Sequence, residues 1–196
     1  MWNGKGYNPN GNIQFEIKDG KGYLKKINIF GESEFEGEYL NGEKNGKGKE
    51  YFRSGELKFE GEFLNGKRNG KGKEYFDNGE LKFDGEFLNG KRWNGKIKEY
   101  EDNHLIFEGE YLNGKRWNGK CQEYHDNGTL KYQGEYLKGK RDGKWKAYYS
   151  NGQLKFEGSY LNGKRNGKWK EYKINGKLRY KGGYLNGERL IKKIVK

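Results

Sequence analysis

One motif returns along almost the whole chain, and it limits the fold more than any other feature of the sequence. The starts of its copies lie 24 residues apart, except for one spacing of 25. A period of this length is typical of proteins in which each repeat contacts its neighbours instead of a central core. The copies begin at Phe35, Phe59, Phe83, Phe107, Tyr132 and Phe156, with a partial copy at Tyr180.

Each copy reads as two β-strands and two turns. In the copy that begins at Phe59, residues 57–63 alternate between apolar or glycine positions and charged side chains, which predicts a strand with one apolar face. Segment 65–70 is predicted as the hairpin turn, 71–76 as the second strand and 77–79 as the turn into the next copy. Because every connection is short, we expect one elongated, twisted, single-layer antiparallel β-meander of tandem hairpins.

Composition supports this all-β reading. Hydrophobic residues make up 31% and charged residues 35% of the chain, too polar a mixture for a thick central core. Aromatic residues nevertheless make up 16%, and their flat side chains suit a pleated surface. We therefore expect aromatic contacts between neighbouring strands to replace a conventional core.

A glycine stands in the middle of the first strand of every copy, as Gly61 does in the copy that begins at Phe59. Glycine weakens a strand interior, so its recurrence needs a physical reason. We expect an aromatic ring to lie over the bare backbone at each of these positions. Two later copies differ by an extra tryptophan, Trp93 or Trp117, which is predicted as an insertion in the first turn. In the first of these copies a shorter second turn, around Asn103 and His104, restores the spacing.

The sequence offers little for catalysis. The two histidines, His104 and His125, fall in or beside predicted turns, where solvated side chains are the expected reading and a shared metal site is the alternative. Cys121 is the single cysteine, which excludes a disulfide within the chain. The glutamates recur at the same outward positions from copy to copy, with exceptions toward the C-terminal end, as a solvated face would allow. We predict no enzyme activity, no cofactor and no metal site.

The motif Phe59-x-Gly61-Glu62-Phe63-x-Asn65-Gly66-Lys67-x-x-Gly70-x-Gly72 resembles the MORN repeat. The recurring Asn-Gly-x-Leu-Lys between copies is most similar to the bacterial variant of the YwqK-like antitoxin type. The resemblance implies a scaffold that binds proteins, often as a homodimer, with suggested contacts to phospholipids. The chain departs from the pattern where the residue at the Gly72 position becomes Ile97, Cys121, Trp145 and Trp169. A bulkier groove is expected toward the C-terminal end.

Three segments are expected: 1–34 as a degenerate N-terminal repeat or cap, 35–187 as tandem repeats, and 188–196 as a C-terminal cap strand or tail. Residues 190–196 are predicted to cap the last strand, since an open sheet edge invites pairing with other chains. Pairing of this end with a second copy is the alternative. Neither a signal peptide nor a membrane-spanning stretch is expected, which favours a cytoplasmic protein, free or bound to a membrane surface.

Positive charge is concentrated in the last third of the chain. Residues 1–131 contain 23 basic and 23 acidic residues, whereas residues 132–196 contain 18 basic and 5 acidic residues. We predict an anion- or lipid-binding patch there, with a solvated end of the array as the alternative. Nucleic acid is a less favoured partner than acidic protein or anionic lipid. The candidate residues of the patch are Lys164, Arg165, Lys168, Lys170, Arg179 and Lys181.

The leading functional hypothesis is a binding scaffold that holds a peptide or helix of a partner protein in an aromatic groove. Two alternatives stay open at this point: peripheral binding to anionic phospholipid membranes through the basic third, and an antitoxin-like role as the partner of a toxin protein. The last alternative is implied by the resemblance alone. The candidate groove residues are Tyr136, Trp145, Tyr149, Tyr160 and Trp169.

Overall fold

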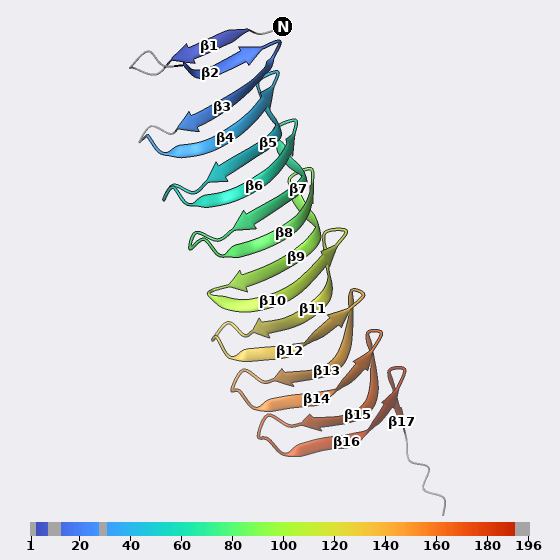
Figure 1. Ribbon diagram of the computed structural model, residues 1–196. Helices are drawn as coiled ribbons and strands as arrows, with labels where there is room; N and C mark the ends of the chain where they lie inside the picture. Colours follow the sequence, from blue (N-terminus) through green and yellow to red (C-terminus); the bar gives the residue numbers. More distant parts are fainter. Residues whose placement is uncertain (1–2, 8–12, 28–30, 191–196) are drawn as a thin grey trace, which may run out of the picture. The chain divides into compact units, whose positions relative to one another are not determined.

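The computed structural model describes residues 3–7, 13–27 and 31–190 (Figure 1). Within these ranges the chain forms seventeen β-strands and no helix, as the alternating pattern predicted. The strands are β1 Gly4–Tyr7, β2 Ile13–Lys18, β3 Lys21–Ile27, β4 Ser33–Leu40, β5 Glu43–Tyr51, β6 Leu57–Leu64, β7 Lys67–Tyr75, β8 Leu81–Leu88, β9 Lys91–Glu101, β10 His104–Leu112, β11 Lys115–Tyr124, β12 Leu130–Leu137, β13 Lys140–Tyr148, β14 Leu154–Leu161, β15 Lys164–Tyr172, β16 Leu178–Leu185 and β17 Glu188–Leu190.

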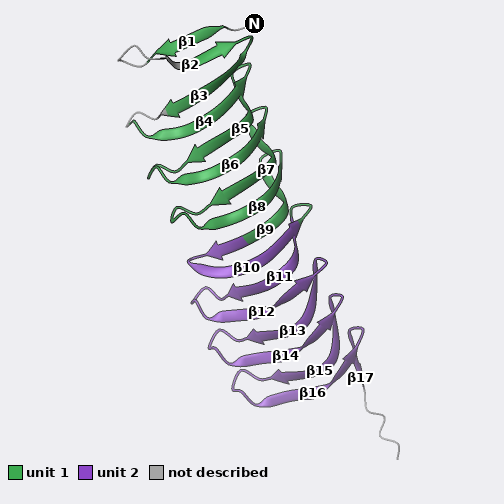
Figure 2. Ribbon diagram, viewed as in Figure 1, with its two compact units in different colours: residues 1–97, 112–114 green, residues 98–111, 115–196 purple. Residues whose placement is uncertain are grey.

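The chain divides into two compact units (Figure 2). Unit 1 contains residues 1–97 and 112–114, and unit 2 contains residues 98–111 and 115–196. Within unit 1 the strands pair antiparallel in sequence order, as β6 does with β5 and β7. Within unit 2 the same holds, as for β14 with β13 and β15. The predicted all-β antiparallel meander of hairpins is confirmed.

Alternation along each strand gives the sheet of each unit two different faces. In β6 of unit 1, Phe59 and Phe63 point to one side, and Glu60 and Glu62 point to the other. The partner strands keep this division, because Lys73 of β7 lies directly across from Glu60. We call the two sides of a unit its aromatic face and its charged face.

The hairpin turn is shorter than the sequence predicted. Only Asn65 and Gly66 form it, with φ of +50° and +75°, the conformation of a type I′ turn, and β7 already begins at Lys67. A bulge follows within β7, where Gly70 has φ of +90°. The carboxylate of Glu62 accepts a hydrogen bond from the backbone N–H of Lys71 at 3.2 Å, which satisfies a donor in this bulge. The second Asn-Gly of the motif therefore bends a strand instead of closing a turn.

The extra tryptophans do not lie in the turns, contrary to the prediction. Trp93 is the bulged residue of β9, because Arg92 and Asn94 pair with consecutive residues of β8. Trp117 likewise lies within a strand, β11. The sequence could not reveal this, since a residue added to a hairpin can enter its turn or its strand. The shortened second turn is confirmed as Asp102 and Asn103, with φ of +46° and +63°.

The ends of the repeat array continue the same hairpin geometry. Asp19 and Gly20, between β2 and β3, have φ of +54° and +75°, the turn conformation of the regular copies. At the other end β17 pairs with β16 through Glu188 and Leu185. Most of the predicted C-terminal cap, residues 191–196, lies outside the described ranges.

Candidate functional site

Phenylalanine rings form the core of unit 1 on its aromatic face. Phe59 meets Phe63 on its own strand at 5.3 Å between ring centroids and Phe87 on β8 at 5.1 Å. Both contacts are edge-to-face, the arrangement that the quadrupoles of aromatic rings favour. Phe59 is 0% exposed, so the ring is removed from water although the sheet is a single layer.

Bare backbone beneath the rings explains the repeated glycine. A Cβ atom on Gly61 would lie 2.7 Å from the Phe59 ring and 2.6 Å from the Cα of Gly72. A Cβ atom on Gly72 would lie 2.6 Å from the same ring. The expectation that an aromatic ring lies over this backbone is confirmed, and glycines on two facing strands together make the room.

In unit 2 the hairpins β12–β13 and β14–β15 obtain their covering rings from the opposite strand. Trp145 and Trp169 lie on β13 and β15, and their rings cover Gly134 and Gly158, where a Cβ atom would lie 2.2 Å from the indole. Both tryptophans are 1% exposed. The indole N–H of Trp169 donates to the carbonyl of Ser159 at 3.0 Å, so burial leaves its donor satisfied.

Four of the five predicted groove residues form one continuous row in unit 2. Tyr136, Trp145, Tyr160 and Trp169 follow one another with centroid distances of 5.7, 5.8 and 5.2 Å. Tyr149 lies apart, beside a turn, and its hydroxyl donates to the carbonyl of Tyr172 at 2.8 Å. Because both indoles are buried, this row provides packing, and an open groove along their rings is not available.

Guanidinium groups and carboxylates cover the aromatic rings. In unit 1 Arg68 lies 4.2 Å from the centroid of Phe59 and pairs with Glu50 at 2.7 Å. Glu74 pairs with Arg92 at 2.7 Å and, more loosely, with Arg68 at 3.5 Å. Burial alone would raise the pKa of Glu74, but the hydrogen bond and charge of Arg92, with the charge of Arg68, outweigh it and lower that pKa.

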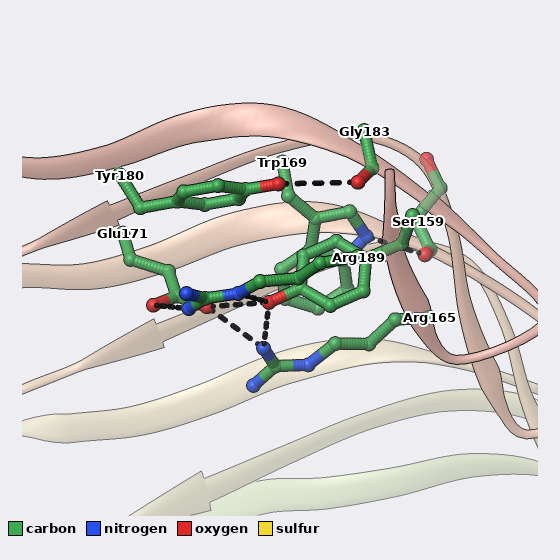
Figure 3. A network of polar contacts seen from close by, with 8 residues as sticks. Ser159, Arg165, Trp169, Glu171, Tyr180, Gly183 and Arg189 are labelled. Atoms are coloured by element: carbon green, nitrogen blue, oxygen red, sulfur yellow. Dashed lines mark hydrogen bonds and ion pairs between the residues drawn. The ribbon is translucent and has the colours of Figure 1, made fainter. Parts of the chain in front are cut away.

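Figure 3 shows the same arrangement in unit 2, with Glu171 between two arginines. Arg165 donates to Glu171 at 2.8 Å and Arg189 donates to it at 3.0 Å. Arg165 also stacks on Trp169, 4.4 Å from its ring. This layer was missed in the sequence, although the basic residue that recurs two positions after the hairpin turn of each copy and the Lys-Glu-Tyr at the end of several second strands could have indicated it.

The charged face of unit 1 carries both signs of charge around a shallow groove. Lys73 faces Glu60 on one side and Asp84 on the other, so acids and bases alternate from strand to strand. The groove has a volume of about 660 Å³, and its floor includes the backbone at Gly61 and Gly72. The Tyr75 hydroxyl donates to Glu60 at 2.7 Å. Burial of the Tyr75 side chain is the larger cause, and this hydrogen bond the second, that raises the pKa of Tyr75 to about 12.

The charged face of unit 2 loses acids on β14 and β16 but keeps its lysines. At the positions that Glu60 and Glu62 hold in β6, β14 carries Glu157 and Ser159, and β16 carries Lys181 and Gly183. Lysines lie at the corresponding places on the intervening strands β13 and β15. Those lysines are Lys144, Lys146, Lys168 and Lys170.

The structure divides the predicted anion-binding patch. Lys168, Lys170, Arg179 and Lys181 alternate onto the charged face of β15 and β16, while Lys164 is exposed beside the hairpin turn. Arg165 lies on the aromatic face, where Glu171 and Trp169 occupy it. The reason is that strand alternation separates neighbours such as Lys164 and Arg165.

The histidines and the cysteine have structural contacts. Nε2 of His125 lies 3.1 Å from the carbonyl of Tyr148, to which it donates, and the ring of His104 lies 4.4 Å from that of Tyr124. Cys121 is buried, and burial raises its pKa to about 11.

In the described part of the chain, no three His, Cys, Asp or Glu side chains are grouped to hold a metal ion. The same ranges contain no helix long and apolar enough to cross a membrane.

Two repeat profiles match the chain. The MORN repeat matches residues 35–56, 59–80 and 83–93, and the MORN repeat variant matches residues 117–138 and 141–162. Neither match identifies the antitoxin subtype, and no curated protein is significantly similar to the chain. The MORN matches cover β4–β5, β6–β7 and β8 with the start of β9, and the variant matches cover β11–β12 and β13–β14. Together they cover half of the sequence. The chain therefore belongs to the MORN-repeat proteins.

Proposed function

We propose that this chain is a non-enzymatic binding scaffold that holds an acidic partner protein on the charged face of β13–β16. MORN repeats are generally associated with protein or membrane binding. The observation that carries the proposal is the loss of acids described above. In β6 and β8 of unit 1 the four acidic positions hold Glu60, Glu62, Asp84 and Glu86; in β14 and β16 of unit 2 they hold Glu157, Ser159, Lys181 and Gly183.

The local chemistry favours an anionic partner. Lys146 lies across from Glu157, which pairs instead with Lys170 at 2.8 Å. Lys168 lies across from Gly183, which offers no side chain to pair with it. Exposed like charges in adjacent strands repel one another, and an acidic surface relieves that repulsion. The aromatic row, whose indoles are buried, would then hold the lysines in a fixed spacing instead of contacting the partner.

A double substitution tests this surface. Ser159→Glu with Lys181→Glu restores the acids of unit 1 and changes the net charge by −3. Lys67→Glu with Leu88→Glu makes the same change at exposed hairpin ends of unit 1 and serves as the control. Binding partners are recovered from the native cell with each chain and identified by mass spectrometry. We expect an acidic protein to be retained by the wild type and the control and lost by the first variant; equal recovery by both variants would refute the proposal.

An anionic membrane surface is the second candidate for the same face. Leu137, Leu161 and Leu185 end β12, β14 and β16 with about half of each side chain exposed. Leucines beside lysines are the combination that lets a protein bind shallowly to anionic lipid. Sedimentation with phosphatidylcholine vesicles, with and without phosphatidylserine, distinguishes this candidate. Binding that depends on phosphatidylserine and falls with added salt supports it, and binding that ignores lipid charge excludes it.

The antitoxin-like role stays a prediction from the resemblance, and a toxin gene next to this one would support it.

A further inference from the structure

The Arg–Glu layer of the aromatic face follows a rule that can be read from three carboxylates. Each carboxylate lies on a strand whose second residue is basic. Each pairs with that basic residue and with the basic residue at the same position two strands further along the chain. Glu50 pairs with Lys44 at 2.6 Å and with Arg68 at 2.7 Å. Glu171 pairs with Arg165 at 2.8 Å and with Arg189 at 3.0 Å (Figure 3). Glu74 lies between Arg68 and Arg92 in the same way.

On β13 the carboxylate of this rule is missing altogether. Ala147 lies across from Tyr132 of β12 and Phe156 of β14. Glu74 lies across from Phe59 and Phe83 in the same register, so Ala147 occupies the position of a bridging carboxylate. The alanine is 6% exposed and leaves that position without an acid.

Arg141 loses its partner as a result. It lies on the same strand as Ala147, with its guanidinium 4.6 Å from the ring of Trp145 and 5.7 Å from that of Tyr160. Glu123, at the position of the preceding carboxylate, turns away to pair with Lys131 at 2.5 Å and is 37% exposed. Among the described residues no carboxylate pairs with Arg141, whereas Arg68, Arg92, Arg116, Arg165 and Arg189 all have one.

We propose that the vacant carboxylate position beside Ala147 binds a carboxylate or an oxyanion of similar size, held between Arg141 and Arg165. A guanidinium group presents its N–H donors in a plane, and it binds a two-oxygen acceptor through two parallel hydrogen bonds. Stacking on Trp145 fixes the orientation of the Arg141 guanidinium before the anion arrives. The anion then replaces the side-chain carboxylate that the other positions of the layer supply for themselves.

The same chemistry can come from two sources, a small free oxyanion or an acidic side chain of a partner. The geometry favours neither by itself, because a glutamate side chain ends in the group that acetate carries. This site lies on the aromatic face, so it is independent of the lysines of the charged face. It can bind whether or not the surface of β13–β16 does.

The test compares binding of acetate, phosphate and a hexaglutamate peptide by the wild type and by designed variants. Ala147→Glu supplies the missing carboxylate from the chain itself, and Ser150→Glu makes the same charge change at an exposed turn residue nearby. The readout is the NMR shift of the Trp145 indole N–H, followed through a titration at fixed ionic strength. We expect the wild type and Ser150→Glu to bind with equal affinity and Ala147→Glu to bind at least tenfold more weakly.

A gain of binding sharpens the test. Glu74→Ala should create a second site of the same kind between Arg68 and Arg92. At anion concentrations that saturate the wild type, isothermal titration calorimetry should therefore count one site in the wild type, two in Glu74→Ala and almost none in Ala147→Glu. Circular dichroism checks that each variant is folded. Saturable binding of acetate or phosphate identifies a free oxyanion as sufficient, and binding of the peptide at least tenfold tighter identifies a partner side chain. Equal binding by the wild type and Ala147→Glu, or no binding of any probe, would overturn the proposal.

Discussion

Hairpin β6–β7 of unit 1 and hairpin β14–β15 of unit 2 bury a similar aromatic row but take the covering ring from different strands. In unit 1 the ring of Phe59 reaches from β6 over its own glycine and that of β7. In unit 2 the ring of Trp169 reaches from β15 over Gly158 of β14, and Phe156, at the position of Phe59, moves aside to a tilted contact at 5.2 Å. A single-layer repeat therefore needs one large ring per glycine site, whichever strand supplies it.

Removing a covering ring should have the largest effect on stability. Phe59→Ala and Trp169→Ala each delete a side chain that is at most 1% exposed, and each should cost about 3–5 kcal/mol of unfolding free energy. Urea denaturation followed by circular dichroism measures the loss. Ile174→Ala, at an exposed turn residue, should stay within about 0.5 kcal/mol of the wild type. If Trp169→Ala lowered the unfolding free energy no more than Ile174→Ala does, the indole would not be part of the core. The predicted open aromatic groove would then explain the row of rings better.

Adding a methyl group beneath the covering ring should affect the two units in different ways. Gly61→Ala and Gly158→Ala should each cost about 1–3 kcal/mol, because both positions lack room for a Cβ atom. At Gly158 the nearest obstacle is the side chain of Trp169, whereas at Gly61 it includes the backbone of β7. Double-mutant cycles should therefore show that Trp169→Ala relieves much of the cost of Gly158→Ala, while Phe59→Ala relieves little of the cost of Gly61→Ala. Equal relief in both units would contradict this distinction.

Much of this fold could be predicted from the sequence because the repeat states the same pattern many times. The period-two alternation around Phe59 and the Asn65-Gly66 turn are local signals, and both are confirmed in the structure. The role of Gly70 was harder to predict. An Asn-Gly pair can close a turn or bend a strand, and the choice depends on pairing with Glu62 across the hairpin.

The candidate site could be predicted only in part, because its members are separated by the two faces of the sheet. Sequence alone grouped Arg165 with Lys168, but strand alternation and the bulge between them place these side chains on opposite faces. The tryptophans and tyrosines were named together as candidates for a groove, yet whether such a row is open or covered depends on the arginines above it. Arg141 and Arg165 lie over the indoles, a contact that arises from register and not from local composition.

Acid should weaken the carboxylate layer in both units. The pKa of Glu171, like that of Glu74, is lowered: burial would raise it, but the hydrogen bond from Tyr184 and the charges of Arg165 and Arg189 prevail. A carboxyl group whose pKa is lower in the folded chain stabilises the fold above its unfolded pKa of about 4.3, and this stability is lost as the pH falls through the folded pKa. Unfolding free energy should therefore fall as the pH drops below about 5.

Glu74→Gln should remove part of this dependence at a cost of about 1–2 kcal/mol at pH 7, because Arg92 loses its charged acceptor. Glu62→Gln, on the charged face of the same unit, is the matched control, because it removes the same charge outside the Arg–Glu layer. Urea midpoints measured between pH 3 and pH 7 compare the two variants. Identical slopes for both would show that the layer does not bind its carboxylates as the distances indicate.

The smallest effect concerns the tyrosines of the charged face, whose hydroxyl groups meet different acceptors. In unit 1 the Tyr75 hydroxyl donates to the carboxylate of Glu60 on the adjacent strand at 2.7 Å, and in unit 2 the Tyr124 hydroxyl donates to the amide oxygen of Gln122 on its own strand at 2.6 Å. Glu60→Gln gives Tyr75 an amide acceptor in place of the carboxylate. We expect the pKa of Tyr75 to fall from about 12 toward 10, because the charge of Glu60 and the bond to a carboxylate are removed while burial remains.

The change is measured from the NMR shift of the Tyr75 ring carbon that carries the hydroxyl, assigned with Tyr75→Phe and followed through an alkaline titration. Unfolding free energy should change by only about 0.5 kcal/mol, since a neutral acceptor still meets the hydroxyl. Glu62→Gln, two residues along β6, should leave the Tyr75 titration where it is. A Tyr75 pKa that stays near 12 in Glu60→Gln would mean that burial alone raises it, and that the charged face of unit 1 is held by packing of its tyrosines more than by its alternating charges.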